Sequence, residues 1–202
     1  RRVLFRSGRM NKLPPKVVWI TGASSGIGAA VARRLARAGY LVAASARSAD
    51  KLLALAQEDH GSGQIIAYPL DVTDAAAQRA VLDKIHADLG SIDVAILNAG
   101  TYVPDDAFHL DIAKLRLQFA LNVFSVMDAV AQLLPRMKQQ KSPQIAIVSS
   151  VAGYRGLPHA TAYGGTKAAL INMAESLKPE CDAANIKLQL ICPGFVKTPL
   201  TD

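Results

Sequence analysis

Residues 21–28 read Thr-Gly-Ala-Ser-Ser-Gly-Ile-Gly, and this stretch decides the fold. It follows an apolar run and precedes a helical pattern, so it connects a strand to a helix. In that setting Gly22 would permit the tight turn, Gly26 would let the backbone approach a pyrophosphate, and Gly28 would let helix and strand pack closely. The phosphates would face the helix N-terminus, where N–H groups and the helix dipole favour negative charge. The stretch therefore predicts a dinucleotide-binding loop, although many glycine patterns only make turns.

The rest of the chain alternates apolar runs with amphipathic stretches, which is typical of repeated strand–helix units and a parallel sheet. Strands are expected at residues 16–21, 41–46, 64–70, 92–97, 144–149 and 187–192. Helices are expected at 25–38, 49–60, 74–89, 112–139 (interrupted near Pro135) and 162–184. Several strands are nearly continuous apolar runs, as when helices cover both sheet faces. The predicted fold class is α/β: a Rossmann-type doubly wound parallel sheet with helices on both faces, in three α/β/α layers.

Length and charge limit the number of domains and the kinds of partner. The 202 residues suit one domain, expected over residues 10–202. Residues 1–9 are expected to be a non-native or disordered leader, because Met10 looks like the natural start. A signal peptide is the alternative, but the apolar run of residues 3–5 is too short for one. That leader holds four of the 23 basic residues, so the remainder carries 19 basic against 16 acidic residues, or +3. No basic stripe is evident, which predicts no nucleic-acid partner.

The apolar runs and the cysteines predict a cytoplasmic location. No stretch approaches the ~20 apolar residues of a membrane span, so no membrane partner is expected. Cys181 and Cys192 form neither a close metal-like pair nor a disulfide framework, so no metal site is expected. They are interpreted as small packing residues in a reducing compartment.

A second motif lies at the start of the helix expected at 162–184. Tyr163 and Lys167 are four residues apart and share one helix face, and Ser150 ends the preceding strand. A free tyrosine, with a pKa near ~10, is a poor acid–base catalyst at neutral pH. A nearby ammonium would stabilise the phenolate and lower that pKa. The spacing is what an activated tyrosine needs, although alone it is more often a helix that happens to carry both residues.

Together with other short motifs in the same order, these residues resemble the short-chain dehydrogenase/reductase family in its short form. The resemblance runs from residue 16 to residue 198. It comprises the glycine loop, Asp-Val-Thr at 71–73, Asn-Ala-Gly at 98–100, Asn122, Ser-Ser at 149–150, the Tyr163/Lys167 pair, and Pro-Gly at 193–194 with Thr198. Each motif alone is weak support for the family, but seven motifs in the family's order and spacing are specific to it. Relatives continue beyond residue 202, so the chain is expected to lack a C-terminal substrate lid and the last strand.

The resemblance implies catalytic roles for four residues. Tyr163 would be the general acid in carbonyl reduction and the base in alcohol oxidation. Lys167 would lower the pKa of Tyr163 and hold the nicotinamide ribose hydroxyls. Ser150 would hydrogen-bond the substrate oxygen, and Asn122 would hold a water that passes protons by way of Lys167. Asn122 could instead be a helix-kink residue, and Thr198 only a cap.

The resemblance also implies the residues that bind the cofactor. Asp71 would contact the adenine, Asn98 would tie the central strands, and the segment from Pro193 to Thr198 would fix which nicotinamide face presents hydride. The full set is Gly22, Ser24, Ser25, Gly26, Ile27, Gly28, Arg47, Asp71, Val72, Asn98, Ala99, Gly100, Tyr163, Lys167, Pro193, Gly194, Val196 and Thr198.

The end of the second expected strand bears on the choice of cofactor. An NAD site has an acidic residue there for the ribose 2′-hydroxyl, whereas this strand ends in Ala46, Arg47 and Ser48. Arg47 could bind a 2′-phosphate through a planar, charge-assisted contact, although a solvated surface arginine is the simpler alternative. NADP(H) is therefore preferred. NAD(H) stays possible, because Ser25 stands where some NADP-preferring relatives carry a basic residue.

The expected function is that of an oxidoreductase that interconverts a small-molecule carbonyl and an alcohol by hydride transfer. A homodimer or homotetramer is expected from the resemblance of the helices at 112–139 and 162–184 to those that pair subunits in the family. Two alternatives stay open, because fold does not fix function. One is a non-catalytic NADP(H)-sensing protein on the same fold, and the other is an inactive truncated product.

Overall fold

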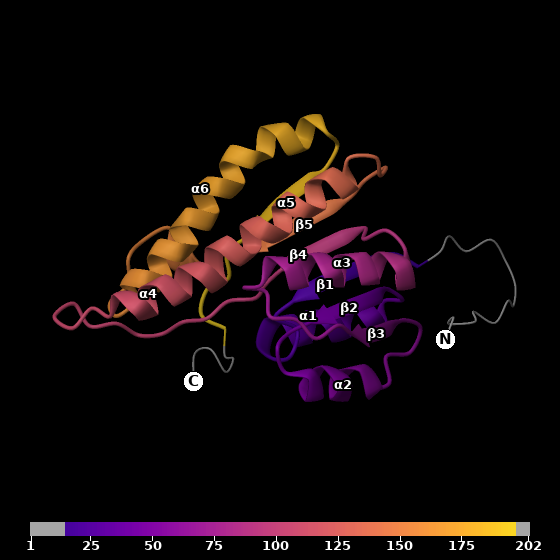
Figure 1. The fold of residues 1–202 in the computed structure, drawn as a ribbon, viewed down its shortest axis with the longest axis horizontal. Helices are drawn as coiled ribbons and strands as arrows, with labels where there is room; N and C mark the ends of the chain where they lie inside the picture. Colours follow the sequence, from indigo (N-terminus) through magenta and orange to yellow (C-terminus); the bar gives the residue numbers. More distant parts are fainter. Residues whose placement is uncertain (1–14, 197–202) are drawn as a thin grey trace, which may run out of the picture.

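The computed structural model describes residues 15–196, which contain a six-stranded parallel sheet between helices (Figure 1). The strands are β1 (Val17–Thr21), β2 (Leu41–Ser45), β3 (Gln64–Ala67), β4 (Val94–Leu97), β5 (Gln144–Val148) and β6 (Lys187–Ile191). Their order, β3-β2-β1-β4-β5-β6, reverses direction between β1 and β4, where such sheets bind ligands. The predicted fold class is confirmed. The predicted leader at 1–9 and the predicted contact at Thr198 lie outside the described residues.

Helices cover the sheet on both faces. On one face lie α1 (Gly26–Arg37) and α2 (Ala49–Gln57), and on the other lie α3 (Ala75–Leu89), α5 (Ser125–Met137) and α6 (Thr161–Ala183). Strand β1 is fully buried, and its side chains alternate between the two layers. Val18 and Ile20 pack with α1 and α2, whereas Val17 and Trp19 pack with the other three helices. Burial on both faces explains the nearly continuous apolar strands.

The long helix predicted at 112–139 is irregular in its middle rather than near Pro135. It consists of α4 (Ile112–Phe119), the π-helical turn η1 (Ala120–Phe124) and α5. The predicted interruption near Pro135 is wrong, because Pro135 lies inside α5, which continues to Met137. A proline close to a helix C-terminus removes one hydrogen bond but need not end the helix. The π turn contains Asn122, and π turns are frequent at functional sites.

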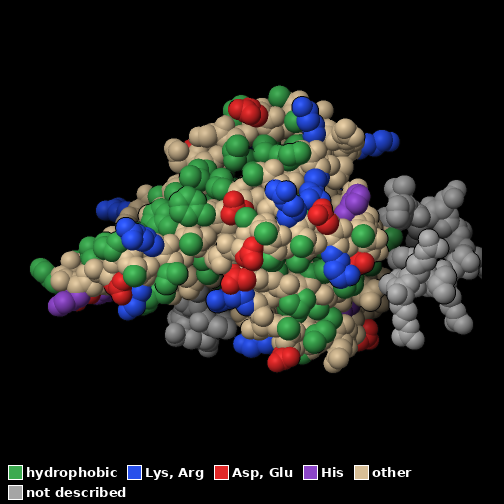
Figure 2. All heavy atoms as spheres, viewed as in Figure 1, with side chains coloured by type: hydrophobic (Ala, Val, Ile, Leu, Met, Phe, Trp, Pro, Cys, Tyr) green, Lys and Arg blue, Asp and Glu red, His purple; other side chains and the backbone are tan. Residues whose placement is uncertain are grey.

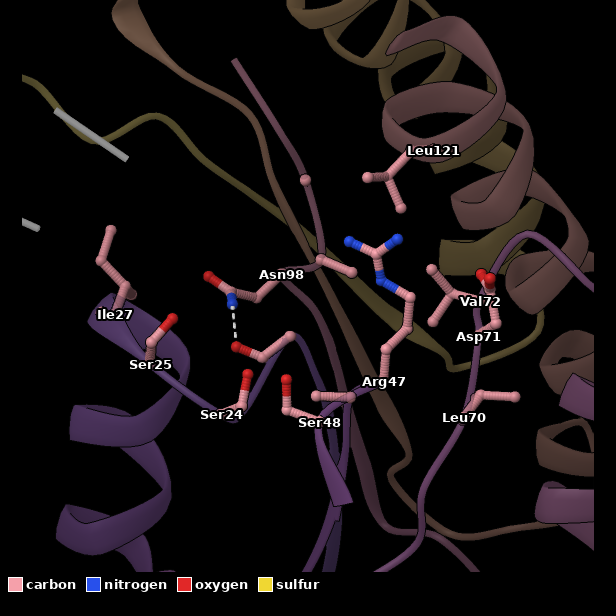
Figure 3. A pocket seen from close by; sticks show the side chains of 15 residues that line it. Ser24, Ser25, Ile27, Arg47, Ser48, Leu70, Asp71, Val72, Asn98 and Leu121 are labelled. Atoms are coloured by element: carbon pink, nitrogen blue, oxygen red, sulfur yellow. Dashed lines mark hydrogen bonds between the residues drawn. The ribbon is translucent and has the colours of Figure 1, made fainter. Parts of the chain in front are cut away.

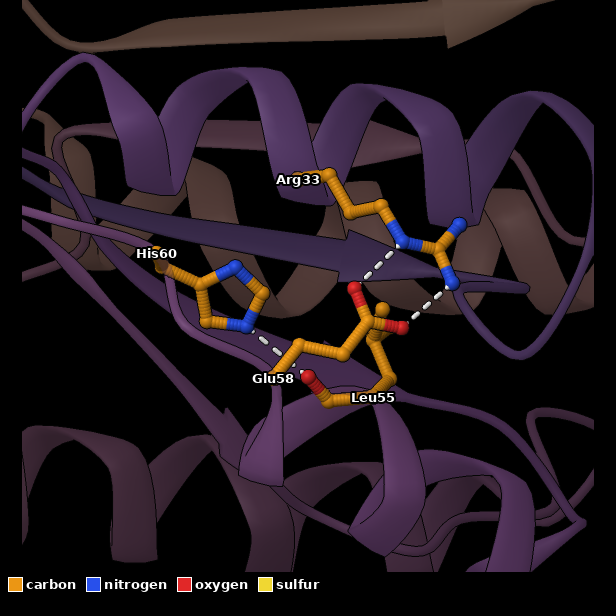
Figure 4. A network of polar contacts seen from close by, with 4 residues as sticks. All are labelled: Arg33, Leu55, Glu58 and His60. Carbon is orange, nitrogen blue, oxygen red and sulfur yellow. Dashed lines mark hydrogen bonds and ion pairs between the residues drawn. The ribbon is translucent and has the colours of Figure 1, made fainter.

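Helix α2 is shorter than the predicted 49–60 because the residues after it bond elsewhere (Figure 4). Glu58 has an extended backbone, and its carboxylate accepts two bonds of 2.7 Å from Arg33 of α1. The buried His60 lies with Nε2 2.8 Å from the carbonyl oxygen of Leu55. These contacts between α1 and the end of α2 turn the chain toward β3.

Strand β3 also ends earlier than predicted, at residue 67 instead of 70. The chain nevertheless continues alongside β2, because Tyr68 N donates to Ala44 O at 2.8 Å and Leu70 N to Ala46 O at 3.0 Å. This continuation carries Asp71 to the carboxyl edge of the sheet. The other predicted boundaries agree with the structure to within about two residues.

The helical stretch Ile112–Met137 corrects one expectation. Within the described residues it is long and apolar enough to cross a membrane by length and composition, whereas no such stretch was expected. Of its most apolar window, 44% is buried inside the protein. The core helix of a soluble protein meets the same criterion, so the stretch is weak support for a membrane span.

Candidate active site

Two adjacent cavities lie at the carboxyl edge of the sheet, where the strand order reverses. The larger, of about 310 Å³, lies beside the glycine loop (Figure 3). The smaller, of about 90 Å³, lies beside Tyr163 and Lys167. Both are lined by Ile27, Asn98 and Gly100, so they join the glycine loop to the Tyr163 motif.

Most of the predicted site residues line one of these cavities. The larger is lined by Gly22, Ser24, Ser25, Gly26, Ile27, Arg47, Asp71, Val72, Asn98, Ala99 and Gly100. The smaller is lined by Ser150, Tyr163, Lys167, Pro193, Gly194 and Val196, besides the shared residues. Gly28 and Asn122 are not among the lining residues: Gly28 packs against Gly22, and Asn122 is fully buried.

Sequence reasoning missed some of the lining. These residues are Ala46, Ser48, Leu70 and Leu121 in the larger cavity, and Val148 and Ser149 in the smaller one. Ala46 and Ser48 flank Arg47 at the strand end, and Ser149 precedes Ser150, so the motifs already quoted contain all three although none is in the predicted set of site residues. Nothing local in the sequence signals Leu121, which the π turn brings over the cavity. Within residues 15–196 no group of three or more His, Cys, Asp or Glu side chains could hold a metal ion.

The glycine loop has the shape that a pyrophosphate requires. Gly26 has φ of 52°, a left-handed conformation that glycine adopts without strain. A Cβ on Gly28 would overlap the carbonyl oxygen of Gly22, so only glycine lets α1 start so close to β1. The first-turn N–H groups of α1 have no partner within the helix, and the side chain of Ser25 does not cap them. The first turn also lacks acidic residues. This helix end fits the phosphates of a dinucleotide.

Asn98 joins the two central strands directly beside the loop. Its backbone N–H donates to Thr21 Oγ1 at 3.0 Å, and its Nδ2 donates to the carbonyl oxygens of Thr21 and Gly22 at 3.1 and 3.3 Å. Ala99 N also donates to Thr21 Oγ1. The arrangement agrees with the role expected for Asn98, and it adds Thr21 as a residue that shapes the loop.

Arg47 and Asp71 lie at the far end of the larger cavity. Arg47 extends its guanidinium across the cavity toward Val72 and Leu121 (Figure 3). The Asp71 carboxylate accepts bonds from Thr73 N at 2.9 Å and Thr73 Oγ1 at 2.7 Å. Those two bonds lower the pKa of Asp71, and the charge of Arg47 lowers it further. A cationic side chain thus follows directly after Ala46, which stands where an NAD site has a carboxylate.

Lys167 lies one turn below Tyr163 on α6 and is deeply buried. Its Nζ donates to the carbonyl oxygen of Val148 at 3.0 Å and lies 5.7 Å from the centroid of the Tyr163 ring. Burial lowers the pKa of Lys167 to about 8, although an electrostatic interaction with Cys192 opposes this shift. The ammonium is therefore still the main form at neutral pH.

Tyr163 is half-buried, and its pKa moves in the direction opposite to the expected one. Burial raises the pKa of Tyr163, and a hydrogen bond with Ser150 lowers it by less. The expected lowering by Lys167 does not contribute in this structure, and desolvation outweighs the hydrogen bond with Ser150. Tyr163 therefore holds its proton at neutral pH, as a general acid must before it donates one.

Asn122 is fully buried and uses its side chain to hold two segments together. Its Oδ1 accepts from Thr101 N at 2.8 Å, and its Nδ2 donates to Thr101 O at 2.8 Å and to Thr166 Oγ1 at 3.1 Å. Thr166 in turn donates to the carbonyl oxygen of Tyr163 at 2.7 Å. The π turn thus reaches α6 through Asn122, while a bound water at this residue stays a prediction.

The comparisons with known proteins agree with this geometry. A family model described as short chain dehydrogenase matches residues 16–202. A 3-oxoacyl-[acyl-carrier-protein] reductase of Thermotoga maritima is 34% identical over 194 residues, which cover 95% of this chain and 78% of the relative. An uncharacterized oxidoreductase of Myxococcus xanthus is 34% identical over 193 residues, covering 95% of this chain and 76% of the relative.

Solved structures of similar proteins share the fold closely. A short-chain dehydrogenase from Streptomyces avermitilis has a TM-score of 0.84 and 34% identity, covering 93% of this chain and 68% of its own. An actinorhodin polyketide ketoreductase variant crystallised with NADPH has a TM-score of 0.88 and 27% identity, covering 93% of this chain and 73% of its own.

Proposed function

Because this chain belongs to the short-chain dehydrogenase family of oxidoreductases, we propose that it interconverts a carbonyl and an alcohol with NADP(H) as the preferred cofactor. The observation that carries the proposal is the pair of adjacent cavities, which share Ile27, Asn98 and Gly100. One has the helix end for a pyrophosphate, and the other has Ser150, Tyr163 and Lys167. A dinucleotide lying along both would bring its nicotinamide to the tyrosine.

The chemistry divides between the cofactor and three side chains. NADP(H), when bound, supplies or accepts the hydride. Tyr163 holds a proton on its hydroxyl and gives it to the carbonyl oxygen, or takes it back in the reverse direction. Ser150 donates to the same oxygen and so stabilises the negative charge that develops there. Lys167 stabilises the resulting phenolate and offers its remaining N–H groups to the ribose hydroxyls.

The preference for NADP(H) is supported by charge at the adenosine end of the site. Arg47 lines the cavity beside Ser48, and the preceding residue is Ala46 rather than an acid. A guanidinium pairs well with a phosphate, whereas a carboxylate there would favour NAD. The similar ketoreductase crystallised with NADPH agrees with this choice.

Substitution of Tyr163 by Phe tests the catalytic role. The variant keeps the ring but loses the proton, so turnover should fall by about 10²–10⁴-fold, the usual value of general acid catalysis. The measurement is the rate of NADPH oxidation with a panel of ketones, beside a titration of NADPH binding. Binding should be nearly unchanged. Near wild-type turnover on every ketone would remove Tyr163 from the mechanism.

The same assay separates the proposal from its alternatives. A wild-type chain that binds NADPH but reduces no ketone would be a sensing protein, and one that neither binds nor reacts would be an inactive product. A location in the cytoplasm stays a prediction, which the free thiols of Cys181 and Cys192 favour.

A homodimer or homotetramer is proposed as the assembled form. The outer side of α4 and η1 exposes Ile112, Leu117 and Phe124, and Figure 2 shows hydrophobic side chains gathered along α4. Leu117 is 68% and Phe124 60% exposed, and gathered exposed apolar side chains of this kind can mark an interaction surface. A second copy of the chain would cover it. Light scattering that gives only the monomer mass would contradict this proposal.

A further inference from the structure

The helix that carries Tyr163 and Lys167 has no cap from its own sequence. Its N-cap residue is Ala160, whose side chain offers no hydrogen-bond acceptor. The N–H groups of the first turn have no partner within the helix and need one elsewhere. The carboxylate of Asp105 accepts from Thr161 N at 3.1 Å and from Ala162 N at 2.9 Å. A loop distant in sequence therefore supplies the cap, one residue before Tyr163.

The Asp105 carboxylate is ionised in this position. Burial raises its pKa, but the hydrogen bonds from Ala162 and Thr161 together outweigh that effect, and the net pKa is lowered. A negative charge at a helix N-terminus is also favoured by the helix dipole. The cap of α6 is thus a carboxylate with a negative charge that accepts two backbone hydrogen bonds.

The backbone of Asp105 is itself fixed against the segment that leads into α6. Asp105 N donates to the carbonyl oxygen of His159 at 3.0 Å, and His159 Nδ1 lies 3.0 Å from the carbonyl oxygen of Asp105. Tyr102 also donates its hydroxyl to the carbonyl oxygen of His159, at 3.2 Å. The loop that bears Asp105 and the segment that leads into α6 are therefore joined by backbone and side-chain hydrogen bonds in addition to the cap itself.

The loop that bears Asp105 is held from α4 as well. Gln118 is buried, and its amide accepts from Val103 N at 3.1 Å and donates to Val103 O at 3.3 Å. One helical turn later Asn122 makes the equivalent pair of bonds with Thr101. Residues 101–105 consequently form a brace between α4 and the start of α6. Asp105 is the end of this brace that reaches the catalytic helix.

We propose that Asp105 is a positioning residue for catalysis: its cap fixes the first turn of α6 and thereby the place of the Tyr163 hydroxyl relative to Ser150. The ring of Tyr102 in the same brace meets the Tyr163 ring edge-on, with centroids 5.2 Å apart. Loss of the cap frees the first turn while Lys167, one turn further along, stays buried. The kinetic consequence rests on the proposed function, whereas the cap can be measured without turnover.

The test compares Asp105→Ala, Asp105→Asn and the control Asp106→Ala in the full chain. Asp106 is the adjacent exposed carboxylate, and it bonds Phe108 N and His109 within its own loop instead of α6. With a ketone that the wild type reduces, Asp105→Ala should lower kcat by about 10- to 100-fold, since small misplacements of reacting groups cost that much. NADPH affinity should stay unchanged. Asp105→Asn keeps one acceptor oxygen and should recover most of kcat, and Asp106→Ala should match the wild type.

Two further measurements keep the test decisive. Tyrosine labelled with ¹³C at Cζ, with the Tyr163 signal assigned through Tyr163→Phe, should show that signal shifted in Asp105→Ala and not in Asp106→Ala. Amide exchange at 161–163 should be faster only in the Asp105 variants. If the wild type reduces no ketone, the proposed function fails, and these two measurements still decide the cap.

Three results would overturn the proposal. They are a wild-type kcat in Asp105→Ala, an equal loss in Asp106→Ala, or an unchanged Tyr163 signal with unchanged exchange. If Asp105→Ala does not fold, Asp105→Asn decides: a loss of kcat of a few-fold with faster exchange at 161–163 supports the cap. Wild-type kcat and wild-type exchange in Asp105→Asn would then contradict it.

Discussion

The N-termini of α1 and α6 both lie at this site, and only that of α6 has a side-chain cap. Helix α1 begins after Ser25 with no side-chain cap and with no acidic residue in its first turn. Helix α6 begins after Ala160, and Asp105 takes up the N–H groups of its first two residues. The backbone chemistry of the two ends is the same. The difference separates a helix end that is left open for the proposed phosphate from one that a distant side chain fixes beside the proposed catalytic tyrosine.

The largest effect is expected from giving α1 the kind of cap that α6 has. Ser25→Asp would place a carboxylate over the first-turn N–H groups and against the pyrophosphate. Like charges in close contact cost several kcal/mol, so NADPH and NADH should each bind about 100-fold more weakly, or worse. Fluorescence titration with both cofactors measures this.

Ser25→Ala is the matched control, because it changes the same residue without adding charge. It removes only a neutral hydroxyl that lines the cavity and makes no cap bond, so it should weaken both cofactors far less than Ser25→Asp does. Unchanged cofactor affinity in Ser25→Asp would show that the phosphates do not lie at this helix end.

A smaller and selective effect is expected at the other end of the same cavity. Arg47→Ala should weaken NADPH binding by about one to two decades, because a hydrogen bond to a charged group contributes about 1.5–3 kcal/mol. NADH binding should be almost unaffected, since NADH lacks the 2′-phosphate. Adding Ala46→Asp should then reverse the preference in favour of NADH.

Arg34→Ala, an exposed arginine on α1 away from the cavity, should leave both affinities alone. Equal binding of NADH and NADPH by the wild type would make Arg47 an ordinary surface residue. A loss of both cofactors in Arg47→Ala would instead assign it a structural role in the turn after β2.

The smallest effect is expected from removing the N-cap of α3, which lies outside the proposed active site. Asp74 caps α3 from its own position and accepts from Ala76 N and Ala77 N, both at 2.9 Å. Asp74→Ala should lower the free energy of unfolding by about 1 kcal/mol, the usual value of an N-cap, and leave kcat unchanged. Urea denaturation measures the loss, and Asp74→Ser should restore most of it. A loss of kcat as large as that of Asp105→Ala would mean that any weakened cap impairs this enzyme.

The parts of the fold that were predicted correctly depend on local patterns. The alternation of apolar runs and helical stretches gave a parallel sheet between helices, and the glycine loop was placed correctly between β1 and α1. The errors arose where distant contacts decide the outcome. Pro135 was expected to interrupt its helix, yet the irregularity is the π turn around Asn122, which bonds Thr101 and Thr166. Likewise α2 ends at Gln57, and Glu58 after it has an extended backbone and pairs with Arg33 of α1.

The sequence by itself determined the fold class, the glycine loop between β1 and α1, and the place of Tyr163 and Lys167 on one helix face. Strand periodicity, glycine conformation and four-residue helix spacing are properties of short segments. Only the tertiary structure decided which helix end is capped, since Asp105 and Ala162 are 57 residues apart in the chain. The same holds for the pKa of Tyr163, which rises because the folded protein removes water from the ring. Desolvation and long-range hydrogen bonds depend on which segments the fold brings together, and no short stretch of sequence contains that information.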